Sequence, residues 1–151
     1  MIVQIQKKWH TVFIMFFTIW LFGIIITPIL AQSGNFYLNL IAKFLYFFYQ
    51  PVCHQIPERS FHIDRAIFTV CVRCFSFYLT GFLMSIYYLY KRRIKLWNYF
   101  IYGIFLGLAT FDFLLERFGL YHDLPLIRFF TGITLGMAVF HLVIISMNSI
   151  D

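Results

Sequence analysis

The sequence predicts an all-α, polytopic membrane protein: a bundle of four transmembrane helices plus one interfacial or re-entrant helix. Hydrophobic residues make up 62% of the 151-residue chain and charged residues only 12%, whereas soluble domains average roughly half and a quarter. Aromatic residues, which are part of that hydrophobic share, make up 23% of the chain, a composition suited to helix ends in the headgroup layers. We therefore expect one transmembrane domain over residues 1–151, with the lipid bilayer as its first partner.

The first predicted span covers residues 9–30 and follows the basic pair Lys7 and Lys8. It reaches the ~20 residues that cross the hydrocarbon core of a bilayer. A cleaved signal peptide is the alternative, because a small-residue sequence follows at residues 31–33. The apolar run is longer than the ~7–15 residues of a signal core, so we expect the span to be retained, although the sequence does not settle cleavage.

Three further spans are predicted over residues 67–90, 97–115 and 125–146. Pro125 suits the first turn of the last one, where a helix loses no backbone donor to proline. Residues 35–49 are apolar and aromatic but include a polar asparagine and Lys43, so we expect an interfacial or re-entrant helix there.

Basic residues set the predicted orientation. Lys7, Lys8 and the basic cluster at residues 91–95 lie on the same side of a four-span bundle, and cytoplasmic loops are enriched in lysine and arginine. We expect a multi-pass protein of the cell (inner) membrane with cytoplasmic termini and an extracytoplasmic loop around Cys53. The basic residues that give the chain its net charge of +6 flank apolar runs and do not form a basic stripe, so no nucleic-acid partner is expected.

The three cysteines and one histidine form a candidate metal site. Cys53 and His54 are adjacent in a polar loop, while Cys71 and Cys74 have a spacing that places both on one face of a helix. Thiolate and imidazole are the donors that tetrahedral zinc takes, so zinc is the predicted cofactor, and His62 is a spare ligand. Adjacent ligands are unusual, and two alternatives stay open: thiol redox or disulfide chemistry, and three buried thiols without a ligand.

Charged residues are predicted to share one shallow layer beneath the outer surface. Arg73, Asp112 and Arg128 each lie a few residues inside an outer span end, and ~1.5 Å of rise per residue gives them similar depth. With Arg59 from the loop they form a predicted polar pocket for an anionic lipid headgroup or a phosphate-bearing ligand. The alternative is that these charges only neutralise one another inside the membrane.

Glycines at four-residue spacing predict close helix contacts in the last two spans. The predicted contact residues are Gly103, Gly107, Gly132 and Gly136. His141 lies deeper in the last span and is interpreted as a hydrogen-bonded packing residue. Nothing in the sequence fixes the oligomeric state, so assembly into an oligomer is compatible with it.

Two motifs resemble those of a family of small prokaryotic membrane proteins of unknown function, with the signature CHQ-x-P-x-RSF followed by C-x-R-C. The chain carries them as Cys53-His54-Gln55-Ile56-Pro57-Glu58-Arg59-Ser60-Phe61 and Cys71-Val72-Arg73-Cys74. The family pattern is also matched at Tyr78, Gly81, Asp112 and residues 128–136. It departs from the family pattern at Arg65, Val72 and Phe113. The resemblance covers most of the chain from residue 28 onward and implies a membrane location, but no substrate.

Three functional hypotheses follow from these residues. The first is a membrane metalloprotein, with a structural site if all four ligands bind and an open, reactive position if three bind. The second is a membrane thiol-disulfide oxidoreductase that uses Cys71 and Cys74. The third is a transporter or assembly subunit whose site is purely structural. The sequence does not decide whether the protein is an enzyme.

Overall fold

Five helices dominate the computed structural model, which describes residues 2–4, 7–91, 93–119 and 124–148. Four of them are long and apolar enough to cross a membrane, and the shorter apolar helix α2 is the fifth, so the predicted fold class is confirmed. In chain order the helices are α1 (Lys7–Ala31), α2 (Phe36–Tyr49), α3 (Val72–Tyr90), α4 (Tyr99–Arg117) and α5 (Pro125–Asn148).

Local chemistry explains where several helices begin. The side-chain oxygen of Asn35 accepts a hydrogen bond from the backbone amide of Tyr37 (2.9 Å), which caps α2. Asn98 caps α4 in the same way. Helix α5 starts at Pro125, whose ring fixes a helical φ without removing an intrahelical donor.

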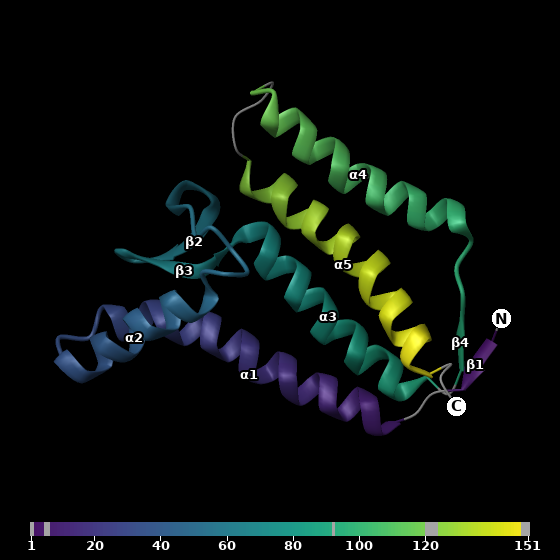
Figure 1. Cartoon of the computed structure of the whole chain (residues 1–151), viewed down its shortest axis with the longest axis horizontal. Coiled ribbons are helices and arrows are strands. Elements are labelled where there is room, and N and C mark those ends of the chain that lie inside the picture. Colours follow the sequence, from purple (N-terminus) through teal and green to yellow (C-terminus); the bar gives the residue numbers. More distant parts are fainter. Residues whose placement is uncertain (1, 5–6, 92, 120–123, 149–151) are drawn as a thin grey trace.

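The long helices pack in the order α1, α3, α5, α4 (Figure 1). Helices α3 and α5 run in the same direction, and α5 crosses α3 at two glycines. A Cβ at Gly132 would overlap the backbone oxygen of Arg73, and a Cβ at Gly136 would lie 2.8 Å from the Cβ of Thr80. These two glycines therefore allow the close approach of α3 and α5.

Within the described residues, the other glycine pair does not pack against a neighbouring helix. Apart from their own helix backbone and chain neighbours, no atom of the described residues lies within 4 Å of a Cβ built at Gly103 or Gly107, so the predicted close contact at these glycines is not one with a neighbouring helix in this part of the chain. The reason is the face that α4 presents to α5, because the buried residues of α4 are Tyr102, Ala109 and Asp112. Four-residue spacing predicts a smooth helix face but not which face has a partner.

A β-hairpin occupies part of the segment that the sequence analysis assigned to a loop and to the start of a span. Strand β2 (Ser60–Ile63) pairs antiparallel with β3 (Ala66–Cys71), and Asp64 in the connecting turn has a φ of 49°. Helix α3 consequently begins at Val72 rather than near residue 67. A short apolar run rich in β-branched and aromatic residues fits a strand as well as a helix, which explains the difference.

The two ends of the bundle differ. At one end, β1 (Ile2–Gln4) pairs with β4 (Arg93–Lys95), and the side chains of His10 and Asn148 are 3.4 Å apart. The chain start, the α3–α4 link and the end of α5 therefore meet there, and the β2–β3 hairpin lies at the opposite end (Figure 1). The basic segments near residues 7–8 and 91–95 consequently share one end.

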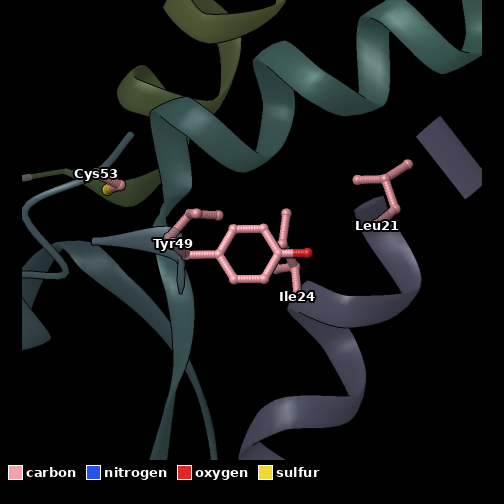
Figure 2. Packing of buried hydrophobic residues seen from close by; sticks show 5 residues of the cluster. Leu21, Ile24, Tyr49 and Cys53 are labelled. Carbon is pink, nitrogen blue, oxygen red and sulfur yellow. The ribbon is translucent and has the colours of Figure 1, made fainter. Parts of the chain in front are cut away.

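A buried cluster connects the first two helices to the cysteine loop. It contains Leu21 and Ile24 of α1, Tyr49 of α2, Cys53, and Val70 of β3. Figure 2 shows the ring of Tyr49 directed toward Ile24 and Leu21. The Tyr49 hydroxyl donates a hydrogen bond to a backbone carbonyl of α1 (2.8 Å), so the residues just before Cys53 are held firmly against α1.

Candidate metal centre and charged network

Three thiols meet at the end of the bundle that carries the hairpin. The Sγ atoms of Cys53, Cys71 and Cys74 all lie within 4.8 Å of one another, so this group could hold a metal ion. A tetrahedral zinc with Zn–S bonds of ~2.3 Å separates its sulfur ligands by roughly 3.8 Å. Only small side-chain movements would bring the three sulfurs to that spacing.

The start of α3 positions two of the thiols. Cys71 is the last residue of β3 and the N-cap of α3, and Cys74 lies in the first turn of that helix. The backbone amide of Cys71 donates a hydrogen bond to the Sγ of Cys53 (3.1 Å), which brings the loop cysteine to the helix start. Helix N-termini and backbone donors both stabilise thiolates, which is the form that binds metals.

The thiols differ in their affinity for protons. Hydrogen bonds from the thiols of Cys71 and Cys74, together with the backbone amides of Cys71 and Gln55, hold the pKa of Cys53 well below its usual range. The pKa of Cys71 is raised, chiefly because its thiol donates a hydrogen bond to Cys53. The arrangement therefore stabilises one thiolate before any ion binds. A bound cation would favour deprotonation of the other two thiols.

The predicted histidine ligands lie apart from this group. Among the described residues the candidate metal group comprises the three cysteines alone, and the side chain of His54 is exposed. His62 lies on β2 and is also exposed. The adjacency of Cys53 and His54 had already indicated that both would not easily reach one ion.

The intramembrane charges predicted to share one depth do come together. Arg73 of α3 forms an ion pair with Asp112 of α4 (2.5 Å) and a second one with Glu116 of α4 (3.1 Å). Asp112 is buried and also accepts a hydrogen bond from the hydroxyl of Thr131 on α5 (2.9 Å). These bonds join α3, α4 and α5 in one layer.

Glu116 is the centre of this charged network, and the sequence analysis did not include it among the site residues. Its carboxylate pairs with Arg59 of the loop (2.5 Å), with Arg73, and with Arg128 of α5 (3.0 Å). Glu116 follows Asp112 by four residues, so both lie on the same helix face. That spacing was the signal that could have identified it.

A pocket of 330 Å³ lies beside the network, between the hairpin and the start of α5. Its polar wall includes Arg59, Ser60, His62 and Arg128, and its apolar wall includes Phe61. The positive end of the α5 helix dipole faces the same region. All four predicted pocket residues, Arg59, Arg73, Asp112 and Arg128, thus belong to one network, and two of them line this cavity.

His141 lies away from both sites, near the opposite end of α5. Its ring is fully buried, stacks on Trp97 with centroids 3.9 Å apart, and lies 2.6 Å from the hydroxyl of Tyr102 through Nδ1. These contacts fit the interpretation of His141 as a hydrogen-bonded packing residue.

The fold and the site define a polytopic membrane protein with a three-cysteine group that could hold a metal ion. The family of predicted membrane proteins DUF2085 matches residues 53–142, and the chain belongs to this family. The matched region includes the three cysteines and the charged network.

A curated relative extends the similarity along the chain. The uncharacterized protein MJ1492 of Methanocaldococcus jannaschii is 34% identical over 141 residues, covering 89% of this chain and 89% of that protein. No solved structure matches. The predicted membership in a family of membrane proteins of unknown function is thereby confirmed, while its signature stays an expectation.

Proposed function

We propose that this protein is a membrane metalloprotein in which Cys53, Cys71 and Cys74 bind one zinc ion. The observation that supports the proposal is the proximity of the three sulfurs, which come from a loop and from the start of a helix. Thiolates are soft ligands, and a tetrahedral set of sulfur donors suits zinc. The ion would fasten the loop to α3.

The fourth ligand position decides whether the site is structural or reactive. With three cysteines bound, the ion keeps one position open for water or another ligand, as catalytic zinc sites do. If His54 moves inward and binds, the site is closed and structural. The exposed position of His54 favours the open form. The neighbouring arginine network would then provide cationic groups for an anionic ligand, such as a phosphate or a lipid headgroup.

The proposal includes an orientation in the cell (inner) membrane. The clustered basic segments around residues 7–8 and 91–95 lie at the end of the bundle opposite the metal centre, whereas the basic residues at the metal-centre end, among them Arg59, Arg65 and Arg117, are dispersed along the chain. Lysine and arginine are enriched on the cytoplasmic side. We therefore assign both termini to the cytoplasm and the metal centre to the extracytoplasmic side.

Metal analysis of the purified protein tests the zinc site. We expect about one zinc per chain by mass spectrometry and loss of that zinc in Cys71→Ser and Cys53→Ser. His54→Ala retains zinc if three cysteines form the site and loses it if His54 is a ligand. His62→Ala is the matched control, because His62 is another exposed histidine of the same region and should retain zinc.

Thiol counting under denaturing conditions identifies the outcomes that would contradict the zinc site. Metal-free protein with a disulfide between Cys71 and Cys74 would refute the zinc site and favour a thiol-disulfide oxidoreductase. Metal-free protein with three free thiols would also refute it and leave the cysteines as buried packing residues.

A further inference from the structure

Two hollows lie along the paired helices α3 and α5. The first is the 330 Å³ cavity described above, which we call the head pocket; it is lined by residues 58–62, Val72, Pro125 and Arg128. The second, the tail groove, has a volume of 630 Å³. Its lining residues come from α3, α5 and the link before α4, and they include Leu79, Leu83, Tyr87, Trp97, Phe129 and Met137.

The two hollows lie along the same flank of the helix pair. On α5, residues 125, 129, 133 and 137 line them at intervals of four, and on α3 residues 72, 79, 83 and 87 do so at helical spacing. The ring of Phe61 in the head pocket lies 6.5 Å from the ring of Phe129 in the tail groove. At ~1.5 Å of rise per residue, the lining residues span about 18 Å on α5 and about 22 Å on α3, more than half of a ~30 Å hydrocarbon core.

The head pocket has the chemistry of an anion site. Arg128 is buried there, and Arg59 is partly exposed with a side-chain accessibility of 34%. The guanidinium groups of Arg59 and Arg128 both line the pocket, and both also pair with Glu116. Glu58 also lines the pocket, but its side chain is exposed and its charge is screened by solvent. The positive end of α5 adds to the attraction for an anion.

The tail groove has the opposite character. Aliphatic and aromatic side chains form nearly all of its wall. Thr80 also lines the groove, and its hydroxyl donates a hydrogen bond to a backbone carbonyl of α3 (2.8 Å). Leu83 and Tyr87 are 55% and 52% exposed, so the groove opens sideways, toward lipid in a membrane. A water-soluble anion would fill the head pocket and leave this groove bare.

We propose that these hollows form one binding site for an anionic membrane lipid, with its phosphate in the head pocket and a hydrocarbon chain in the tail groove. The inference rests on the anion-binding part of the proposed function and names the class of ligand. It does not depend on metal binding. Arg59 and Arg128 would contact the phosphate, and Ile133 and Met137 would contact the chain.

Native mass spectrometry of the full chain in detergent with equimolar phosphatidylglycerol and phosphatidylcholine tests this site. We expect at least fivefold higher retention of phosphatidylglycerol. Arg59→Gln should abolish that preference, whereas Arg65→Gln should not, because Arg65 is an exposed arginine of the hairpin turn that does not line the head pocket.

The groove is tested by filling it. Ile133→Trp should reduce lipid retention severalfold, and Met137→Trp is a second variant in case the first does not fold. Leu142→Trp is the matched control on α5, because Leu142 is exposed and does not line the groove. Equal retention of both lipids by the unmodified protein, or unchanged retention in a folded groove variant, would overturn the proposal.

Two further measurements separate the ligand sources and the two proposals. Glycerol phosphate should displace the lipid poorly; displacement at an equal concentration would show that only the phosphate is recognised and would overturn the lipid site. Zinc content is measured in the same samples. A lipid preference in zinc-free protein would refute the metal centre alone, and a zinc-loaded protein without the preference would refute the lipid site alone.

Discussion

Replacement of Glu116 with glutamine removes the carboxylate that connects three arginines. Glu116 pairs with Arg59, Arg73 and Arg128 at 2.5–3.1 Å, and only 10% of its side chain is accessible. The substitution keeps the size and shape of the side chain. Any loss of stability therefore reports the missing charge rather than a cavity.

The expected loss of stability depends on the ion pairs and hydrogen bonds that remain after the substitution. Breaking a buried ion pair by removing one partner costs roughly 3–5 kcal/mol. The loss here is smaller, because Asp112 still pairs with Arg73 and the glutamine carbonyl still accepts one hydrogen bond. The partly exposed pair with Arg59 contributes only ~0–1 kcal/mol. We expect a decrease of about 2–3 kcal/mol in the free energy of unfolding.

Unfolding of the detergent-solubilised protein by increasing fractions of sodium dodecyl sulfate measures this change. Glu58→Gln is the matched control, since Glu58 is exposed on the 3-10 helix Pro57–Arg59. A surface substitution of this kind changes stability by at most about 0.5 kcal/mol. Equal stabilities of the two variants would show that Glu116 does not hold the network together.

Two other substitutions probe the helix contacts by the same measurement. Gly132→Ala should destabilise the protein by roughly 1–3 kcal/mol, because the added methyl group overlaps a backbone carbonyl of α3. Gly107→Ala is the control, because its methyl group meets no described atom of a neighbouring element. An effect of Gly132→Ala no larger than that of Gly107→Ala would contradict the close crossing of α3 and α5. Tyr102→Phe should cost about 1–3 kcal/mol, because it removes the hydroxyl bonded to the buried ring of His141. Exposed Tyr99 gives the control, and a loss as small as that of Tyr99→Phe would contradict the role of this hydrogen bond.

The sequence was most informative where geometry is fixed by helix rise. The length of each apolar run predicted the long helices, and the position of a charge along a run predicted its depth. Arg73 and Asp112 are 39 residues apart in the chain, yet the structure joins them at 2.5 Å. Depth alone does not give the rotation of each helix about its axis. The four-residue spacing places Glu116 on the same face as Asp112, but which arginines that face meets depends on this rotation.

Local pattern was less informative where two structures fit it equally well. The run at residues 66–71 is apolar and partly β-branched, and the pairing of Cys71 with Ser60 decides in favour of a strand. That pairing joins residues eleven apart in the chain, so the pattern of residues 66–71 taken alone does not contain it. The same limit applies to Gly103 and Gly107, whose spacing permits a close contact without specifying a partner.

The start of α3 connects the two parts of the site. Arg73 lies between Cys71 and Cys74 in a single helical turn, so the residues that would bind the metal and the guanidinium that enters the charged network share one rigid segment. An ion bound by both cysteines would fix that turn, because its ligands belong to the N-cap and to the first turn of the helix. The direction of Arg73 toward Asp112 would then be fixed with it. A metal centre at this position would therefore support the depth and orientation of the charged layer, even if the ion never contacts a substrate.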